Sequence, residues 1–141
     1  MSEESATPDL AERWRQTFEV FAHRDFDALM KFYAHHAVWD ASSLGIDTFE
    51  GRAAIRRVLE EWIAPYEEYE AEFEECRDLG NGVVFAVAHQ AARPPGSTRS
   101  VQDRPAAFVF EWVDGMVVRG SVYYDIDEAR AAGERRAEER G

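Results

Sequence analysis

The sequence predicts a single α+β domain over residues 1–141 with a core at about 8–130, chiefly because the spacing of its apolar residues changes once along the chain. Between residues 7 and 64, apolar side chains recur every three or four positions, as in amphipathic helices, around a short apolar stretch that ends at Asp40. From residue 66 to 125 the spacing is two, which is typical of strands. The predicted order is therefore helix, helix, short strand, helix, and then four strands joined as a meander.

Three helices are predicted from capping residues and apolar stripes. The first begins at Thr7, a candidate N-cap residue that is followed by proline, and the second begins at Asp25. The third runs from about Gly51 to Ala64, after which a proline ends it. The stripes are Leu10, Trp14, Phe18 and Phe21; Phe26, Leu29, Met30 and Tyr33; and Ile55, Val58, Leu59, Trp62 and Ile63. We expect all three stripes to cover one face of the sheet.

The four strands of the meander are predicted at residues 66–77, 83–92, 101–113 and 116–125. In the first strand apolar residues alternate with glutamates, which indicates one buried and one wet face. The second and third are apolar on both faces over much of their length, and Asp114-Gly115 forms a two-residue hairpin turn before the fourth. Residues 126–141 are predicted to form a polar helix or tail that frays, because Gly133 weakens the helix.

Composition excludes several classes of partner and cofactor. Lys and Arg number 16 against 28 Asp and Glu, a net charge of −12 that repels nucleic acid and anionic membranes. Cys76 is the only cysteine, which excludes an intrachain disulfide and a thiolate metal cluster. The longest apolar run, Val83–Ala88, is too short to span a bilayer, and the first ten residues lack the apolar core of a signal peptide. We therefore expect a cytoplasmic protein without a metal or nucleotide cofactor.

Two motifs give the chain a resemblance to a known family. They are F-x-G-R-x-A-I-R-x-x-L-x-x-W from Phe49 to Trp62, and D-G-x-V-x-R, Y-x-D and E-A between Asp114 and Ala129. Together with the predicted order of elements, they resemble the SnoaL-like bacterial branch of the NTF2-like superfamily. The resemblance implies a cone, in which a strongly curved, mainly antiparallel sheet surrounds a deep apolar pocket and the three helices lie on its concave face.

The resemblance is compatible with several activities, because the superfamily includes ketosteroid isomerase, polyketide cyclases, scytalone dehydratase and limonene epoxide hydrolase. The tyrosine of ketosteroid isomerase matches Thr17 here, and its late acid matches the apolar stretch Phe108–Phe110, so the isomerase oxyanion hole is absent. The last-strand aspartate of limonene epoxide hydrolase falls near Val122, so that set is incomplete too. Polyketide cyclases that resemble this branch use an aspartate with a histidine, and Asp40 with His89 is the candidate pair.

Asp40 is the candidate general base, with a pKa raised by apolar neighbours such as Trp39 and Trp62, and His89 and Tyr123 are the candidate groups that assist it. The alternative for Asp40 is a carboxylate that caps the following loop or pairs with an arginine, and the alternative for His89 is the exposed end of a strand. The predicted ligand contacts are Trp14, Phe18, Trp39, Trp62, Arg104 and Arg119. An aromatic stripe of this kind also fits an ordinary core.

Two functions are consistent with these residues. In the first, the protein binds a small apolar or aromatic molecule and catalyses proton transfer, dehydration or aldol-type cyclisation with Asp40 as base. In the second, it is a non-catalytic carrier or dimerisation module, and a salt bridge from Asp40 to Arg104 or Arg119 would favour this reading. The apolar runs Val83–Ala88 and Ala106–Trp112 exceed what three helices can cover, so we also expect a homodimer through the convex face.

Overall fold

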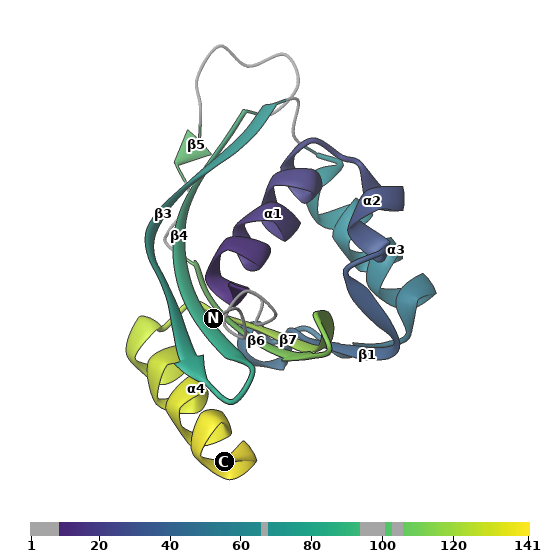
Figure 1. Cartoon of the computed structure of the whole chain (residues 1–141). Coiled ribbons are helices and arrows are strands. Elements are labelled where there is room, and N and C mark those ends of the chain that lie inside the picture. The colour runs from purple at the N-terminus through teal and green to yellow at the C-terminus, as the bar shows by residue number, and fades with distance from the viewer. Residues whose placement is uncertain (1–8, 66–67, 94–100, 103–105) are drawn as a thin grey trace.

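The structure, a computed structural model, describes residues 9–65, 68–93, 101–102 and 106–141, in which four helices surround one curved sheet (Figure 1). The helices are α1 (Leu10–Ala22), α2 (Phe26–Met30), α3 (Arg52–Ile63) and α4 (Ile126–Arg140), with a short 3-10 turn, η2 (Ser42–Leu44). The strands are β1 (Tyr33–Asp40), β2 (Thr48–Glu50), β3 (Glu68–Gly80), β4 (Val83–Arg93), β5 (Val101–Gln102), β6 (Ala106–Val113) and β7 (Met116–Tyr123).

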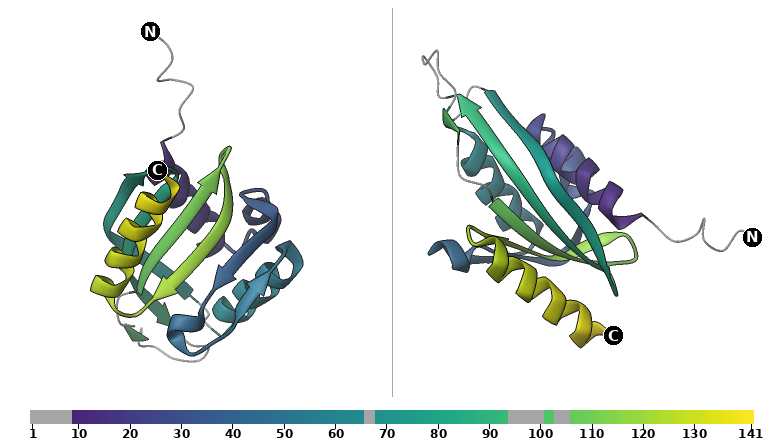
Figure 2. Two further views of the ribbon diagram at one scale, coloured as in Figure 1. Left: turned by 90° about the horizontal axis from the view of Figure 1, so that it is seen from below. Right: turned by 90° about the vertical axis from the view of Figure 1, so that its left-hand side faces the viewer.

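The sheet has the strand order β2-β1-β7-β6-β4-β3, with β5 paired to β4. Every pair of neighbours is antiparallel except β1 and β7, which run parallel. Helices α1, α2 and α3 lie together on the concave face, and α4 lies against the convex face (Figures 1 and 2). The predicted α+β class, the mainly antiparallel sheet and the three helices on its concave face are confirmed.

The strand period of two divides the apolar side chains between two cores. On β4, Val84, Ala86 and Ala88 belong to the larger core between the concave face and α1 to α3. Val83, Phe85 and Val87, at the alternate positions of the same strand, belong to a smaller core under α4. A strand that is apolar on both faces is thus buried on both sides within one chain.

The first two helices differ in their ends from the prediction. The side chain of Asp9 caps α1 by accepting a hydrogen bond from the Glu12 amide at 3.2 Å, whereas Thr7 lies outside the described residues. Helix α2 begins after Asp25 as predicted but ends at Met30. Tyr33 was predicted on the stripe of this helix but instead begins β1, because the chain pairs with β7 there. The Val117 amide donates a hydrogen bond to the Phe32 carbonyl at 2.7 Å.

The C-terminal segment forms a complete helix, and the expectation that it frays at Gly133 is wrong. Helix α4 buries a narrow stripe of small residues, Ala129, Ala132, Gly133 and Ala137. Gly133 lets the helix approach the sheet, because a Cβ atom at this position would lie 3.0 Å from Leu79 Cδ1. Arg130 holds the helix to β3 by two hydrogen bonds to the Glu75 carboxylate, at 3.0 and 3.1 Å.

This helix changes the argument for a homodimer. The expectation of a dimer rested on apolar strand residues that three helices cannot cover, but α4 covers Val83, Phe85 and Val87, which are at most 3% exposed.

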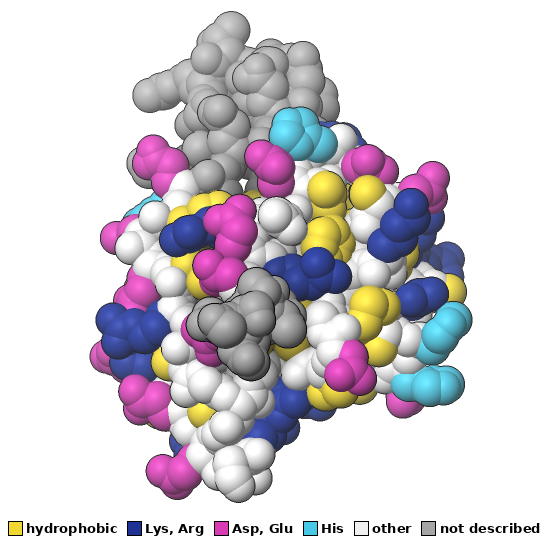
Figure 3. Space-filling model, viewed as in Figure 1, with side chains coloured by type: hydrophobic (Ala, Val, Ile, Leu, Met, Phe, Trp, Pro, Cys, Tyr) yellow, Lys and Arg dark blue, Asp and Glu magenta, His cyan; other side chains and the backbone are white. Residues whose placement is uncertain are grey.

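Figure 3 shows acidic and basic side chains interspersed over one face of the molecule rather than gathered by sign. In the described part of the chain, none of the helices combines the length and the apolar character needed to cross a membrane.

Candidate functional site

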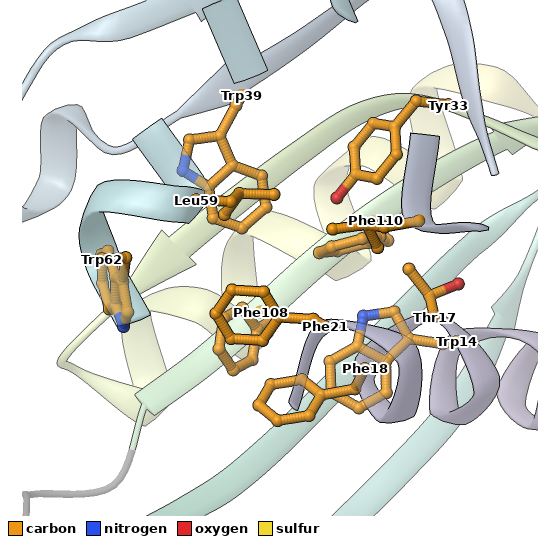
Figure 4. A pocket seen from close by; sticks show the side chains of 11 residues that line it. Trp14, Thr17, Phe18, Phe21, Tyr33, Trp39, Leu59, Trp62, Phe108 and Phe110 are labelled. Atoms are coloured by element: carbon orange, nitrogen blue, oxygen red, sulfur yellow. The ribbon is translucent and has the colours of Figure 1, made fainter. Parts of the chain in front are cut away.

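An aromatic cavity lies between the concave face of the sheet and helices α1 and α3 (Figure 4). Its volume is about 40 Å³. Its wall consists of Trp14, Thr17, Phe18, Phe21, Leu29, Tyr33, Trp39, Leu59, Trp62, Phe108 and Phe110. The four aromatic residues predicted to contact a ligand, Trp14, Phe18, Trp39 and Trp62, all lie in this wall. A cavity of this size holds a water molecule, since one needs roughly 10–15 Å³, but a ring requires the side chains of the wall to move apart.

The aromatic side chains come from elements far apart in sequence and meet edge to face. The Trp14 ring lies 5.1 Å from Phe73 and 5.8 Å from Phe110, both in nearly perpendicular contacts. Trp39 meets Phe110 from the opposite side at 5.8 Å. Pairs of this geometry are favourable beyond the area that they bury, so they fix the shape of the wall.

Tyr33 supplies the only ionisable side chain among the described residues that line the cavity. The residue is 1% exposed, and burial raises the pKa of its phenol far above the ordinary value. Figure 4 shows its hydroxyl pointing into the cavity toward Phe110. Thr17, the other hydroxyl of the wall, donates to the Arg13 carbonyl at 2.9 Å. Within the described residues the Trp39 indole nitrogen is buried without a hydrogen-bond partner.

Asp40 lies on the other face of the sheet. Side chains of a strand alternate between the faces, and Trp39 enters the cavity, so Asp40 points away from it. Its Oδ2 accepts a hydrogen bond from Arg119 Nη2 at 2.6 Å. Its Oδ1 accepts from the Ser42 amide at 2.9 Å and from the Ser42 hydroxyl at 2.5 Å. The carboxylate therefore caps the η2 turn and pairs with an arginine, which is the structural alternative stated for it above.

These partners determine the protonation of Asp40. Burial on its own would raise the pKa of this carboxyl, but the hydrogen bonds from Ser42 and the charge of Arg119 outweigh burial and lower the pKa. A general base with a pKa raised by apolar neighbours was the expectation for a catalytic Asp40. The structure gives the opposite direction, and the carboxylate is ionised at neutral pH.

The predicted assisting groups also lie outside the cavity. His89 shares its strand face with Phe85 and Val87, and its Nε2 lies 2.7 Å from Glu74 Oε2. Tyr123 packs against the core under α4, where burial raises the pKa of its phenol and the Asp40 charge adds to this effect. Asp40, His89 and Tyr123 therefore do not line the cavity. Arg119 faces the same way as Asp40, and Arg104 lies outside the described residues.

Sequence reasoning missed Tyr33 because it was assigned to a helix. It shares strand parity with Ala37 and Trp39, which are also buried, although His35 between them is exposed and the register of β1 against β7 shifts between Tyr33 and Val38. Had β1 been extended back to Tyr33, the alternation would have placed its side chain on the same face as Trp39. Within the described residues, no group of three or more histidine, cysteine or acidic side chains is placed to bind a metal ion.

Comparison with known proteins agrees with this architecture. The sequence profile of the SnoaL-like domain matches residues 14–120. A putative SnoaL-like polyketide cyclase from Shewanella putrefaciens superposes with a TM-score of 0.70 at 13% identity, covering 92% of this chain and 98% of its own. Bal32a, from a soil-derived mobile gene cassette, gives 0.69 at 22% identity over 89% and 95%. An epoxide hydrolase of the LEH-like type from M. tuberculosis gives 0.66 at 16% identity over 88% of both chains.

No curated protein matches the sequence. At these identities the solved structures support the fold and not an activity. The profile match covers most of the described helices and strands, including most of α1, all of α3 and the whole cavity wall. The chain belongs to the SnoaL-like domain family.

Proposed function

We propose that this protein binds a small apolar or aromatic molecule in the cavity and does not use Asp40 as a catalytic base. The observation that carries the proposal is the ion pair of Asp40 with Arg119, which lies on the sheet face opposite to the cavity. Among the described residues of the wall, none is a carboxylate or an imidazole. Proton transfer, dehydration and aldol chemistry all need a group that accepts a proton next to the substrate.

The aromatic wall supports reversible binding of an apolar ligand. Phe18, Phe108 and Phe110 offer apolar surface, and transfer of an apolar ligand from water to such a surface is favourable by roughly 25 cal/mol per Å². Because the cavity measures about 40 Å³, the ligand is expected to be a single ring that separates the wall residues. Trp62 is only partly buried and is the wall residue best placed to move.

The binding of α-methylstyrene, a single-ring hydrocarbon probe, tests the proposal. We expect it to shift the indole N–H signals of Trp14 and Trp39 in a ¹⁵N NMR titration. Leu59→Phe adds a ring to the wall and is expected to abolish these shifts. Val113→Phe, at a residue 46% exposed on β6, is the matched control and should leave them unchanged. Shifts that persist in Leu59→Phe, or no binding by the parent, would refute the proposal.

A further inference from the structure

We infer that the natural ligand is a neutral molecule with a hydrogen-bond acceptor on its ring, such as an aryl ketone, and that Tyr33 donates to that acceptor. This inference rests on the proposed function and identifies the class of ligand. Three features of the cavity support it: a hydroxyl that opens into the cavity without a partner among the described residues, a second donor in the wall, and a described wall that holds no cation.

The first feature is the free-energy cost of enclosing a tyrosine hydroxyl at position 33. Tyr33 as a residue is 1% exposed, its hydroxyl opens into the cavity (Figure 4), and among the described residues none forms a hydrogen bond with that hydroxyl. Burying a hydroxyl without a partner is unfavourable, and phenylalanine would fill the same space without that cost. A ligand acceptor within reach of the hydroxyl would remove the cost, so the tyrosine is explained by a polar group on the ligand.

The second feature decides between a donor and an acceptor on the ligand. A phenol can play either part, but an indole N–H only donates. The Trp39 N–H is buried without a partner in the described part of the chain. In Figure 4 it points toward the side of the cavity where Trp62 lies. The free polar groups of the wall therefore favour a ligand that accepts hydrogen bonds.

The third feature concerns the charge of the ligand. The wall holds no lysine or arginine among its described residues, and an anion in such a cavity would lose its hydration without gaining a counter-charge. Burial keeps the Tyr33 phenol protonated by raising its pKa, so the phenol is a neutral donor. A carboxylate or a phosphate is thereby disfavoured, and a carbonyl oxygen fits.

The position of the donor is fixed by the backbone. Tyr33 pairs with Val117 of β7, and Arg52 Nε donates to the Tyr33 carbonyl at 2.8 Å. The two residues that hold the Tyr33 backbone both lie in regular elements, Val117 in β7 and Arg52 at the start of α3. The backbone that carries the Tyr33 side chain is therefore held in place before a ligand arrives, which lowers the entropy lost on binding.

The test compares two probes of nearly equal shape. Acetophenone carries a carbonyl oxygen where α-methylstyrene carries a methylene group. We expect Tyr33→Phe to weaken acetophenone about tenfold, the effect of one lost hydrogen bond, and to change α-methylstyrene by less than about twofold. Because each probe is compared between parent and variant, the difference in hydrophobicity between the probes cancels. Tyr124→Phe, at an exposed tyrosine, is the matched control and should leave both affinities unchanged.

The outcomes separate the two proposals. If the parent binds neither probe, the proposed function fails. If the parent binds both and Tyr33→Phe changes neither, binding stands but Tyr33 is not the donor. If the variant weakens both probes equally, Tyr33 acts through packing, and the inference is overturned as well. The Trp39 indole N–H signal gives an independent readout, because a carbonyl probe should move it further downfield than the hydrocarbon does.

Discussion

Asp40 at the end of β1 and Arg119 on the adjacent parallel strand β7 form an ion pair, with 2.6 Å between Oδ2 and Nη2. Neither side chain is fully buried, with 21% and 26% of their surfaces exposed. The pair lies behind Trp39, on the side of the sheet away from the cavity. It joins the η2 turn to the centre of the sheet, as expected of a pair that stabilises the architecture.

Replacing Asp40 by asparagine should therefore destabilise the fold. Asparagine keeps the shape and one acceptor for Ser42 but loses the charge that pairs with Arg119. For a partly exposed pair we expect a loss of about 1 kcal/mol in the free energy of unfolding at pH 7. Thermal melting followed by circular dichroism measures it. The affinity for α-methylstyrene should not change, because Asp40 does not line the cavity.

The stability difference between the parent and Asp40→Asn should also depend on pH. The pKa of Asp40 is lowered in the folded state, so its contribution is present above the unfolded value of about 3.9 and is lost as the pH falls through the folded pKa. The difference between parent and Asp40→Asn should thus be largest near neutrality and vanish in acid. Asp47→Asn, at an exposed carboxylate in the next loop, serves as the control. A variant that melts no lower than the parent and binds the probe more weakly would restore the catalytic reading.

The fold was predictable because burial of a helix or strand face leaves a period in the sequence. The stripes of Leu10 to Phe21 and of Ile55 to Ile63 mark the helices that cover the concave face, and the hairpin at Asp114-Gly115 marks the last pair of strands. A polar helix or tail was predicted at residues 126–141, but the packing of α4 against the sheet was not, because its buried stripe consists of alanines and one glycine, which carry almost no hydrophobic contrast with their neighbours.

The candidate site was predictable only in its aromatic part. Most large apolar residues, Trp14 and Trp39 among them, are buried, so their identity is a good guide to their place in the core. The polar residues depend on strand parity and on pairing between distant segments, and a shift of one residue reverses the face. Arg119 was one of two candidate partners named for Asp40, but the pair spans 79 residues and is set by the register of β1 against β7, which no local pattern reveals.

Gly120 should be intolerant of any side chain. A Cβ atom there would lie 2.8 Å from Cε3 of Trp39 and 3.3 Å from Cε1 of Phe110, so alanine must push the Trp39 ring into the cavity. We expect Gly120→Ala to lower the free energy of unfolding by about 1–3 kcal/mol, the usual cost of overpacking, and to weaken the hydrocarbon probe. Denaturant unfolding and the NMR titration measure the two effects.

A smaller ring at Trp39, which pairs with Gly120 on the adjacent strand, provides the control for Gly120→Ala. Trp39→Phe removes the atoms that the new methyl group would strike, so the double variant should regain part of the lost stability. If the two changes are additive, the strain does not pass through Trp39 and the contact has been misjudged.

The last prediction concerns α4 and self-association. Ala129 is fully buried against the convex face, whereas Ala131 on the same helix is exposed. A glutamate at 129 cannot be buried without a cationic partner, so Ala129→Glu should detach the helix and expose Phe85 and Val109, while Ala131→Glu leaves it docked. Static light scattering should then report a larger mass for Ala129→Glu than for the parent. The mass of the parent at micromolar concentration tests the homodimer expected from the sequence. Equal masses for the two variants, with near-ultraviolet circular dichroism showing both folded, would mean that α4 is not what keeps the convex face from associating.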